Sequence, residues 1–386
     1  MRLIKISNLT PGLIVGRPVL DDKGQTLLNQ DVVLTPSYIR ALEMKECTAI
    51  YVKEPDVELD VLPDDDLDPK TRAKAIVSLN KSFQAVEAQV ERLRQQSFEN
   101  LKKLCDTPGL QALMAPGGPF AEVQEAVEAI LNEILTQSTL AGLTSIRTAD
   151  SALHNHCIDV CVVAIMIGRV IGMPNQRLKQ LATGSILHDI GKVFLKKTGD
   201  DVSDVRKHTL LGFELLKNVP DADILVPYVA FEHHERQDGS GQPRGLVGTN
   251  TIQRDRAAHR EKVMTLLGEI AALANYYDHL LAGNASQPPM APDSALHAIQ
   301  NAAGAHLNAE VVKAFLRVVP VYPLGTEVLV RSSDYRNYTG LVTRVNRTQL
   351  DRPVVTLIKD PRGKPISPIE INMVHHEAMQ VRSKIS

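Results

Sequence analysis

Residues that could carry chemistry gather around one short segment, residues 184–192. Within it His188 and Asp189 are adjacent, and Lys192 follows four positions after His188. The run before them is apolar with helical spacing, which predicts a buried helix. Residues three or four positions apart share a face of a helix, so Asp189 and Lys192 are expected to point the same way. Because ionised side chains are rarely buried without a partner, this arrangement predicts a functional site.

Five histidines of the same region lie at or near apolar helical runs. They are His156, His188, His208, His233 and His234. One histidine in an apolar pattern is more often a hydrogen-bonded core residue, but five of them beside an aspartate and a lysine favour a metal site. Imidazole and carboxylate ligands together suit iron, manganese, zinc or nickel.

A pair of metal ions at this site would suit phosphate ester hydrolysis. Two ions about 3.5–4 Å apart can share a hydroxide and clamp a phosphoryl group during in-line attack. The carboxylate of Asp189 can bridge two ions, whereas a histidine cannot. The ammonium of Lys192 can neutralise charge that develops on the phosphate oxygens.

The composition is that of a globular protein. The chain has 386 residues, of which 44% are hydrophobic and 23% charged, and this predicts two or three domains. The formal net charge of −2 means that an anionic substrate needs a local basic cluster, and we expect no nucleic-acid partner. Four cysteines without disulfide or zinc-site spacing are expected to be reduced core residues: Cys47, Cys105, Cys157 and Cys161.

Neither a signal peptide nor a membrane span is expected. Residues 1–5 lack the long apolar region of a signal peptide. The most apolar run, residues 161–173, is interrupted by Arg169 and is too short to cross a membrane. We therefore expect a cytoplasmic protein.

Changes in hydrophobic period divide the chain into four parts, and the expected fold class is a multidomain α+β protein. Residues 1–66 predict a small mixed α/β domain that ends in an acidic linker (56–68), and residues 67–147 predict a helical connector. Residues 148–320 predict an all-α core, and residues 321–386 predict a small β module.

The expected elements follow from periodicity and turn signals. In chain order they are a hairpin (15–20 with 25–33), a helix (36–45), a strand (48–52), connector helices (70–105 and about 121–137) separated by breaks at Pro108 and at 116–119, core helices (160–171, 210–216, 263–281 and 311–319), core loops (236–251 and 284–291), strands (327–330, 339–345 and 354–357) and a turn (360–363). The connector could act as a coupling or dimerising stalk, or it could pack against the core.

Three motifs in this order carry a resemblance to a known family. They are His188-Asp-Ile-Gly-Lys192, His233-His-Glu-Arg236 and Asp238-Gly-Ser-Gly-Gln-Pro-Arg-Gly-Leu246. Together they resemble the HD-GYP family, a branch of the HD metal phosphohydrolases that acts in bacterial cyclic di-GMP signalling. The resemblance covers roughly residues 150–320, and residues 1–66 resemble the domain that often precedes HD-GYP.

The resemblance implies roles for individual residues and for a cofactor. The implied metal ligands are His156, His188, Asp189, His208, His233, His234 and Asn275. Asp189 and Lys192 would be catalytic, and the implied substrate-binding residues are Lys192 and the loop residues Gly241, Gln242 and Pro243. Arg236 and Arg244 are also expected to bind the substrate, because they flank this glycine-rich loop. The implied cofactor is two divalent metal ions, iron or manganese. His154 competes with His156 for the first position, because residues two apart on a helix cannot face the same way.

This sequence departs from the family pattern at three places. Gln242 stands where the family has the tyrosine of its name, and Asn275 stands where the family has a carboxylate ligand, with Asp278 three residues later. The basic residues that usually follow this helix are not evident in residues 281–291.

The first functional expectation is a phosphodiesterase that hydrolyses cyclic di-GMP to pGpG, GMP or both through a metal-bridging hydroxide. The alternative is a degenerate HD-GYP domain that senses cyclic di-GMP or docks a partner, such as a cyclase-domain (GGDEF) protein. The three departures favour the alternative, whereas the nearly complete histidine set favours the enzyme. An HD hydrolase for another nucleotide is a third hypothesis, and the Gly-Ser-Gly loop argues against it. A homodimer through the connector remains open.

Overall fold

The computed structural model describes residues 2–20, 26–45, 47, 49–53, 66–93, 96–137, 140, 152–195, 204–219, 224–252, 262–283, 288–332 and 334–384. Its α-helices are α1 (Pro36–Met44), α2 (Pro69–Val90), α3 (Phe98–Leu104), α4 (Pro108–Met114), α5 (Pro119–Ile134), α6 (Ala152–Val170), α7 (Asn175–Ile186), α8 (Val205–Leu216), α9 (Leu225–Glu232), α10 (Leu266–Ala282), α11 (Pro292–Ala302) and α12 (Ala309–Phe315). Its strands are β1 (Arg2–Lys5), β2 (Ile14–Val15), β3 (Val19–Leu20), β4 (Thr26–Leu28), β5 (Ala49–Lys53), β6 (Glu327–Val330), β7 (Thr339–Arg344), β8 (Val354–Lys359), β9 (Pro365–Asn372) and β10 (Val381–Ser383). Short 3-10 helices are η1 (Ile6–Asn8), η2 (Glu91–Leu93), η3 (Ile190–Phe194) and η6 (Met373–His375).

The N-terminal part is a small α/β unit, as the sequence predicts. Strands β1, β5 and β2 form an antiparallel sheet in that order, and β3 pairs with β4 as the two arms of the expected hairpin. The turn of that hairpin lies outside the described residues. Helix α1 begins after Thr35, whose side chain accepts a hydrogen bond from the backbone N–H of Tyr38, which caps the first turn.

The connector differs from the predicted pair of helices in two respects. The predicted helix over 70–105 is divided, since α2 ends at Val90 and a separate helix, α3, begins at Phe98. Pro108 and Pro119, which we expected to interrupt helical structure, each begin a helix, α4 and α5. Proline is favoured at the first helical position because the missing N–H would be unpaired there in any case. Most of the acidic linker lies outside the described residues, but Leu67 at its end is fully buried.

The connector helices pack against the core. Apolar side chains of α2 and α5, including Leu79 and Ile130, belong to one hydrophobic cluster with the helices that follow. A buried ion pair also joins the two parts: Arg72 on α2 donates to Asp159 on α6 at 2.9 Å. Packing is therefore one role of the connector, and its role in dimerisation stays a prediction.

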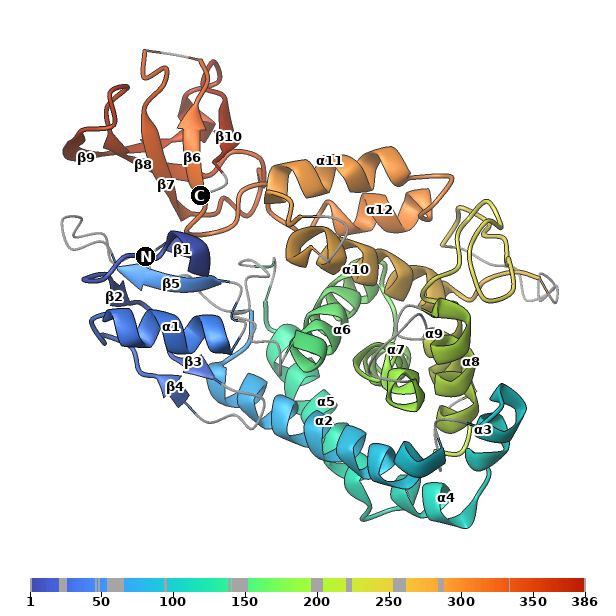
Figure 1. Ribbon diagram of the computed structural model, residues 1–386. Coiled ribbons are helices and arrows are strands. Elements are labelled where there is room, and N and C mark those ends of the chain that lie inside the picture. The colour runs from blue at the N-terminus through green and yellow to red at the C-terminus, as the bar shows by residue number, and fades with distance from the viewer. Residues whose placement is uncertain are drawn as a thin grey trace.

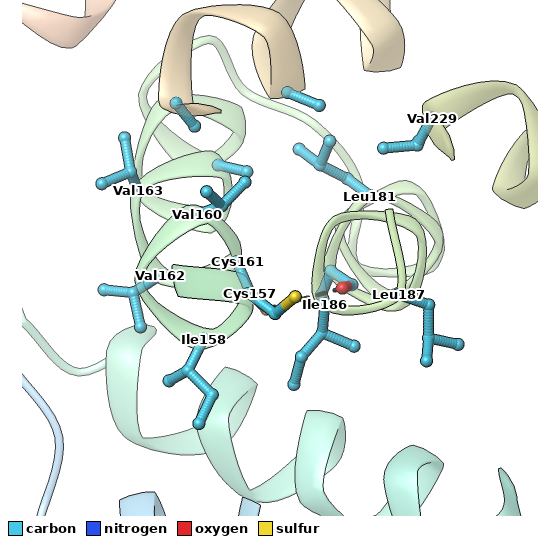
Figure 2. Close-up of a cluster of buried hydrophobic side chains, with 14 of the residues drawn as sticks. Cys157, Ile158, Val160, Cys161, Val162, Val163, Leu181, Ile186, Leu187 and Val229 are labelled. Atoms are coloured by element: carbon cyan, nitrogen blue, oxygen red, sulfur yellow. Dashed lines mark hydrogen bonds between the residues drawn. The ribbon is translucent and has the colours of Figure 1, made fainter. Parts of the chain in front are cut away.

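Helix α6 is the centre of the helical region (Figure 1). It is long and apolar enough to cross a membrane by length and composition, but 83% of the apolar window is buried inside the protein, as for the core helix of a soluble domain. Figure 2 shows Cys157 and Cys161 of α6 beside Ile186 and Leu187 at the end of α7. The thiol of Cys161 donates to the carbonyl of Ala182, and all four cysteines are buried and reduced as expected.

The C-terminal part is an antiparallel sheet of five strands in the order β10-β6-β7-β8-β9. The three predicted strands and the turn after β8 are confirmed. Strands β9 and β10 were not predicted, since β9 is mostly exposed and contains Pro365 and Pro368, and β10 has only three residues. Figure 1 shows this sheet next to α11, and Ser383 of β10 donates a backbone hydrogen bond to Asp293 of α11.

Three separate hydrophobic clusters fill the N-terminal unit, the helical region and the C-terminal sheet. The helical cluster extends from Leu67 to Val319 and thus includes the connector. The predicted domain boundaries at 66, 147 and 320 stay predictions.

Candidate metal centre

The central His-Asp pair lies in a turn and not within the α-helix that the sequence predicts. Helix α7 ends at Ile186, and η3 begins at Ile190, so His188 and Asp189 occupy the connection between them. The side chains of a 3-10 helix eclipse at every third residue, which places Lys192 over Asp189. The Lys192 Nζ atom lies 2.5 Å from Oδ2 of Asp189. The expected pairing of Asp189 with Lys192 is therefore present in a different local structure.

A glycine allows this turn to approach α8 closely. A Cβ atom at Gly191 would lie 1.9 Å from the backbone oxygen of His208, a separation that no side chain could tolerate. The glycine thus permits His208, near the start of α8, to reach Asp189. His233 is the residue that ends α9, and His234 follows it.

Asp189 lies between two groups of histidines. Its Oδ2 atom is 3.6 Å from Nε2 of His156 and 3.5 Å from Nε2 of His188. Its Oδ1 atom is 3.5 Å from Nε2 of His208 and 3.7 Å from Nε2 of His233. Each carboxylate oxygen therefore faces a different pair of imidazoles.

Two sets of potential ligands result from this arrangement. In one, ligand atoms of His156, His188 and Asp189 all lie within 4.8 Å of one another, and in the other the same holds for His208, His233 and His234. The Nε2 atoms of His156 and His188 are 3.2 Å apart, and those of His208 and His233 are 3.3 Å apart. Six of the seven ligands that the sequence predicts are thus brought together.

Backbone carbonyls determine which ring nitrogen of three histidines faces the centre. The Nδ1 atom of His188 lies 2.7 Å from the carbonyl oxygen of Ser185, and that of His233 lies 2.9 Å from the carbonyl oxygen of Ala230. The Nδ1 atom of His208 lies 3.2 Å from the carbonyl oxygen of Asp204. Because a carbonyl only accepts, each Nδ1 carries the proton and leaves the lone pair of Nε2 directed at the centre.

Burial keeps these histidines neutral. It lowers the pKa of His188 to about 3 and holds the pKa values of His233 and His234 well below their usual range. Burial would by itself raise the pKa of Asp189, but the charge of Lys192 beside it lowers this pKa well below its usual value. An anionic carboxylate among neutral imidazoles is the protonation state that metal binding requires.

Helix α10 supplies a second carboxylate to the centre. The Oδ2 atom of Asp278 lies 2.5 Å from Nδ1 of His156, on the ring edge opposite the one that faces Asp189. Metal-binding histidines commonly donate their second N–H to a carboxylate, which fixes the ring and its tautomer. This contact favours His156 over His154 as the first histidine of the candidate site. Its rival His154 packs its ring against Phe83 instead, with 5.4 Å between ring centroids.

Asn275 lies one turn before Asp278 on the same face of α10. It is buried, and its Oδ1 atom makes no hydrogen bond with any residue that the structure describes. Asn275 is not part of either ligand set, so its role as a ligand stays a prediction.

Two buried side-chain oxygens at the site could be compensated by a metal ion. Among the described residues, Oδ1 of Asp189 and Oδ1 of Asn275 are buried and make no hydrogen bond. Such atoms are costly unless something compensates them. A cation beside Asp189 would do so, and the donor set of imidazoles and carboxylate suits divalent transition metals. The residues present therefore fit a metal centre.

The glycine-bearing loop is attached to the turn that holds His233 and His234. The backbone N–H of Gln242 donates to the carbonyl of His234 at 3.1 Å. Oxygens Oε1 and Oε2 of the buried Glu235 accept hydrogen bonds from the backbone N–H groups of Arg244 (2.7 Å) and Leu246 (2.9 Å). A Cβ at Gly241 would lie 2.4 Å from Cα of Glu235, so glycine is required for this contact.

The predicted substrate-binding side chains of this loop lie on the surface. Arg236, Gln242 and Arg244 are exposed, while Gly241 and Pro243 are partly buried. The guanidinium of Arg244 rests over the ring of Phe231 at 5.8 Å. Their roles in substrate binding stay predictions.

Sequence reasoning missed two residues of this region. Glu235 was noted as part of a motif, but its spacing gave no sign that it holds the loop. His279 was not considered, although it follows Asp278 directly. Its ring stacks on that of His156, with 4.7 Å between centroids and 29° between planes, and burial lowers its pKa to about 4.

Comparison with known proteins agrees with this geometry. Residues 146–311 match the family model described as HD domain. The chain is 26% identical over 263 residues to the cyclic di-GMP phosphodiesterase PA4108 of Pseudomonas aeruginosa, an alignment that covers 65% of this chain and 59% of that protein. It is 29% identical to a cyclic di-GMP phosphodiesterase of Thermotoga maritima, over 44% of this chain and 45% of the relative.

A third relative is the cyclic di-GMP phosphodiesterase response regulator RpfG of Xanthomonas campestris, which is 28% identical over 40% of each chain. In all three alignments the chain spans less than two thirds of the relative's length.

Proposed function

We propose that residues 146–311, which match the HD domain model, belong to the HD-GYP family, and that the chain is a metal-dependent phosphodiesterase that hydrolyses cyclic di-GMP. The observation that carries the proposal is the position of Asp189, whose two oxygens face different histidine pairs at 3.5–3.7 Å. A carboxylate in this position can serve two ions at once.

Six residues would hold the metal ions. His156 and His188 would bind on one side of Asp189, and His208, His233 and His234 would bind on the other. Two divalent ions, when bound, would supply Lewis acidity that activates water and neutralises charge on the phosphate. We propose iron or manganese, since the ligands combine imidazoles with a carboxylate.

The chain's own residues would orient the substrate and the ligands. Lys192 is held by Asp189, yet 32% of its side chain is exposed, so its ammonium can also reach a non-bridging oxygen of the phosphodiester. Asp278 would hold the ring of His156. The loop residues Arg236, Gly241, Gln242, Pro243 and Arg244 would contact the rest of the dinucleotide.

The reaction adds water across a phosphodiester bond. The oxygen of one water molecule bonds to phosphorus, the bond from phosphorus to the ribose 3′ oxygen breaks, and the leaving oxygen takes up a proton. One such cleavage gives linear pGpG, and a second gives two molecules of GMP.

The test is turnover of cyclic di-GMP by the full chain. Protein stripped with a chelator is reloaded anaerobically with iron or manganese, and the products are separated by anion-exchange chromatography. We expect the wild type and the surface control Asp334→Ala to form pGpG or GMP, and Asp189→Ala to form neither. Binding without turnover by the metal-loaded wild type would replace the enzyme with the sensor alternative.

Docking of cyclase-domain (GGDEF) proteins, dimerisation through the connector and cytoplasmic location stay predictions. Buried α6 agrees with a protein whose HD domain is soluble.

A further inference from the structure

The metal centre is closed on most sides. His188, Asp189, His208 and His233 are each at most 3% exposed. Three side chains at the centre are partly exposed instead: Lys192, His234 and His279. A phosphodiester must approach where these three side chains reach solvent.

His279 occupies a distinct place at this opening. Its ring stacks on His156, and the residue is close enough to Lys192, Asp189 and His234 to interact electrostatically with each of them. It thus contacts one histidine group through His156 and lies within electrostatic range of His234 and Lys192. No residue that the structure describes makes a hydrogen bond to its ring nitrogens.

The geometry assigns His279 to the substrate and not to the metal ions. It belongs to neither of the two sets of ligand atoms that lie within 4.8 Å of one another. An imidazole carries at least one N–H donor whether it is neutral or protonated. A donor that no described residue engages, at the opening of the candidate site, is available to a phosphate oxygen.

We propose that His279 is a substrate-binding residue whose ring N–H donates a hydrogen bond to a non-bridging phosphate oxygen, beside the ammonium of Lys192. The proposal rests on the proposed function, since it assumes that the centre acts on a phosphodiester. It adds a contact from α10 to the contacts expected from η3 and the glycine-bearing loop.

The test compares two substitutions of similar size. His279→Leu removes the donor, and His279→Gln retains an N–H donor. The surface substitution His297→Ala on α11 is the control. Each metal-reloaded protein is analysed for metal content, for KM and kcat with cyclic di-GMP, and for binding of inorganic phosphate by calorimetry.

We expect His279→Leu to keep the metal content of the wild type. Its KM should be about tenfold higher and its phosphate affinity about tenfold lower, as for one lost hydrogen bond. His279→Gln should recover most of this loss, and His297→Ala should match the wild type. A purely structural role for His279 would instead lower the metal content of both variants.

Two results would overturn the proposal: loss of metal in His279→Leu, or phosphate affinity equal to that of the wild type. Failure of the proposed function gives a different result, because the metal-loaded wild type itself would then not turn over cyclic di-GMP. The phosphate titration would still decide the role of His279 in that case.

Discussion

Asp278 and His156 form a 2.5 Å contact between α10 and α6, on the edge of the His156 ring that faces away from Asp189. The two residues are 122 positions apart in the sequence. The contact makes the orientation of His156, a candidate metal ligand, depend on α10, the same helix that carries Asn275 and His279.

Asp278→Asn should weaken metal binding without removing a ligand. The amide lacks the negative charge that holds the Nδ1 proton of His156, and loss of such a partner typically costs about 10–100-fold in metal affinity. Competition with a metallochromic chelator measures the change. Asp293→Asn on α11 is the control, and unchanged affinity in Asp278→Asn would mean that the contact does not orient the ligand.

Glu235→Gln should loosen the glycine-bearing loop. The substituted amide can accept a hydrogen bond through only one oxygen, so the backbone N–H of Arg244 or Leu246 loses its acceptor. A buried donor without a partner costs about 1–3 kcal/mol. We expect faster hydrogen exchange in residues 238–247 with metal content unchanged, compared with the surface variant Glu310→Gln. Equal exchange in the two variants would remove Glu235 from this role.

The sequence predicted which side chains gather better than it predicted the local structure around them. His-Asp spacing and five histidines sufficed to predict a candidate metal centre, because few other functions require such residues in apolar runs. The same apolar pattern predicted an α-helix through Asp189, whereas η3 begins directly after it. Periodicity does not distinguish an α-helix from a short 3-10 turn. The need for glycine at position 191 is evident only from the nearby backbone of His208, which leaves no room for a Cβ atom.

Contacts between distant segments were beyond sequence reasoning. The pairing of Asp278 with His156 and the stacking of His279 on the same ring depend on how α10 crosses α6. Likewise, the position of Pro108 and Pro119 at helix starts depends on whether the next residues pack against the core, which the residues alone do not reveal.

The stability of the metal-free protein should fall as the pH is lowered from 6.5 to 5. Burial lowers the pKa of His188 to about 3, so in this range the unfolded chain binds a proton that the folded chain does not. Each such histidine reduces the free energy of unfolding by about 1.4 kcal/mol per pH unit. Glu232 acts in the opposite direction, since burial raises its pKa to about 7. Because several histidines oppose this one carboxyl group, we expect the free energy of unfolding to decrease.

Urea unfolding of the chelator-treated protein at pH 5, 6 and 7, monitored through the helix content, measures this dependence. The variant His188→Gln lacks one titrating group and should show a smaller decrease than the wild type. A wild-type free energy of unfolding that is constant or rises towards pH 5 would contradict the neutral state of the histidines.

Removing one member of the ion pair between Arg72 and Asp159 should destabilise the protein more than removing both. Arg72→Met leaves the buried carboxylate of Asp159 without its 2.9 Å partner, and breaking a buried pair in this way costs about 3–5 kcal/mol. The double variant Arg72→Met, Asp159→Leu removes both charges and should recover much of the loss. Chemical denaturation measures both effects, and the exposed pair Lys74 and Glu125 provides a control with little effect. Equal losses in the single and double variants would argue against this account.

Asn275→Asp should have opposite effects on the metal-free and the metal-loaded protein. Without metal, a second carboxylate one turn from Asp278 is buried near a like charge, which should destabilise the fold by at least about 1–3 kcal/mol. With metal, the added charge increases the attraction of the site for cations, and we expect about tenfold tighter binding. Metal titrations and thermal unfolding with and without metal measure the two effects. The variant Asn275→Leu, which offers neither charge nor oxygen, should bind metal more weakly than the wild type. If metal affinity is the same in all three proteins, Asn275 is not a ligand, and the unpaired Oδ1 atom has another explanation.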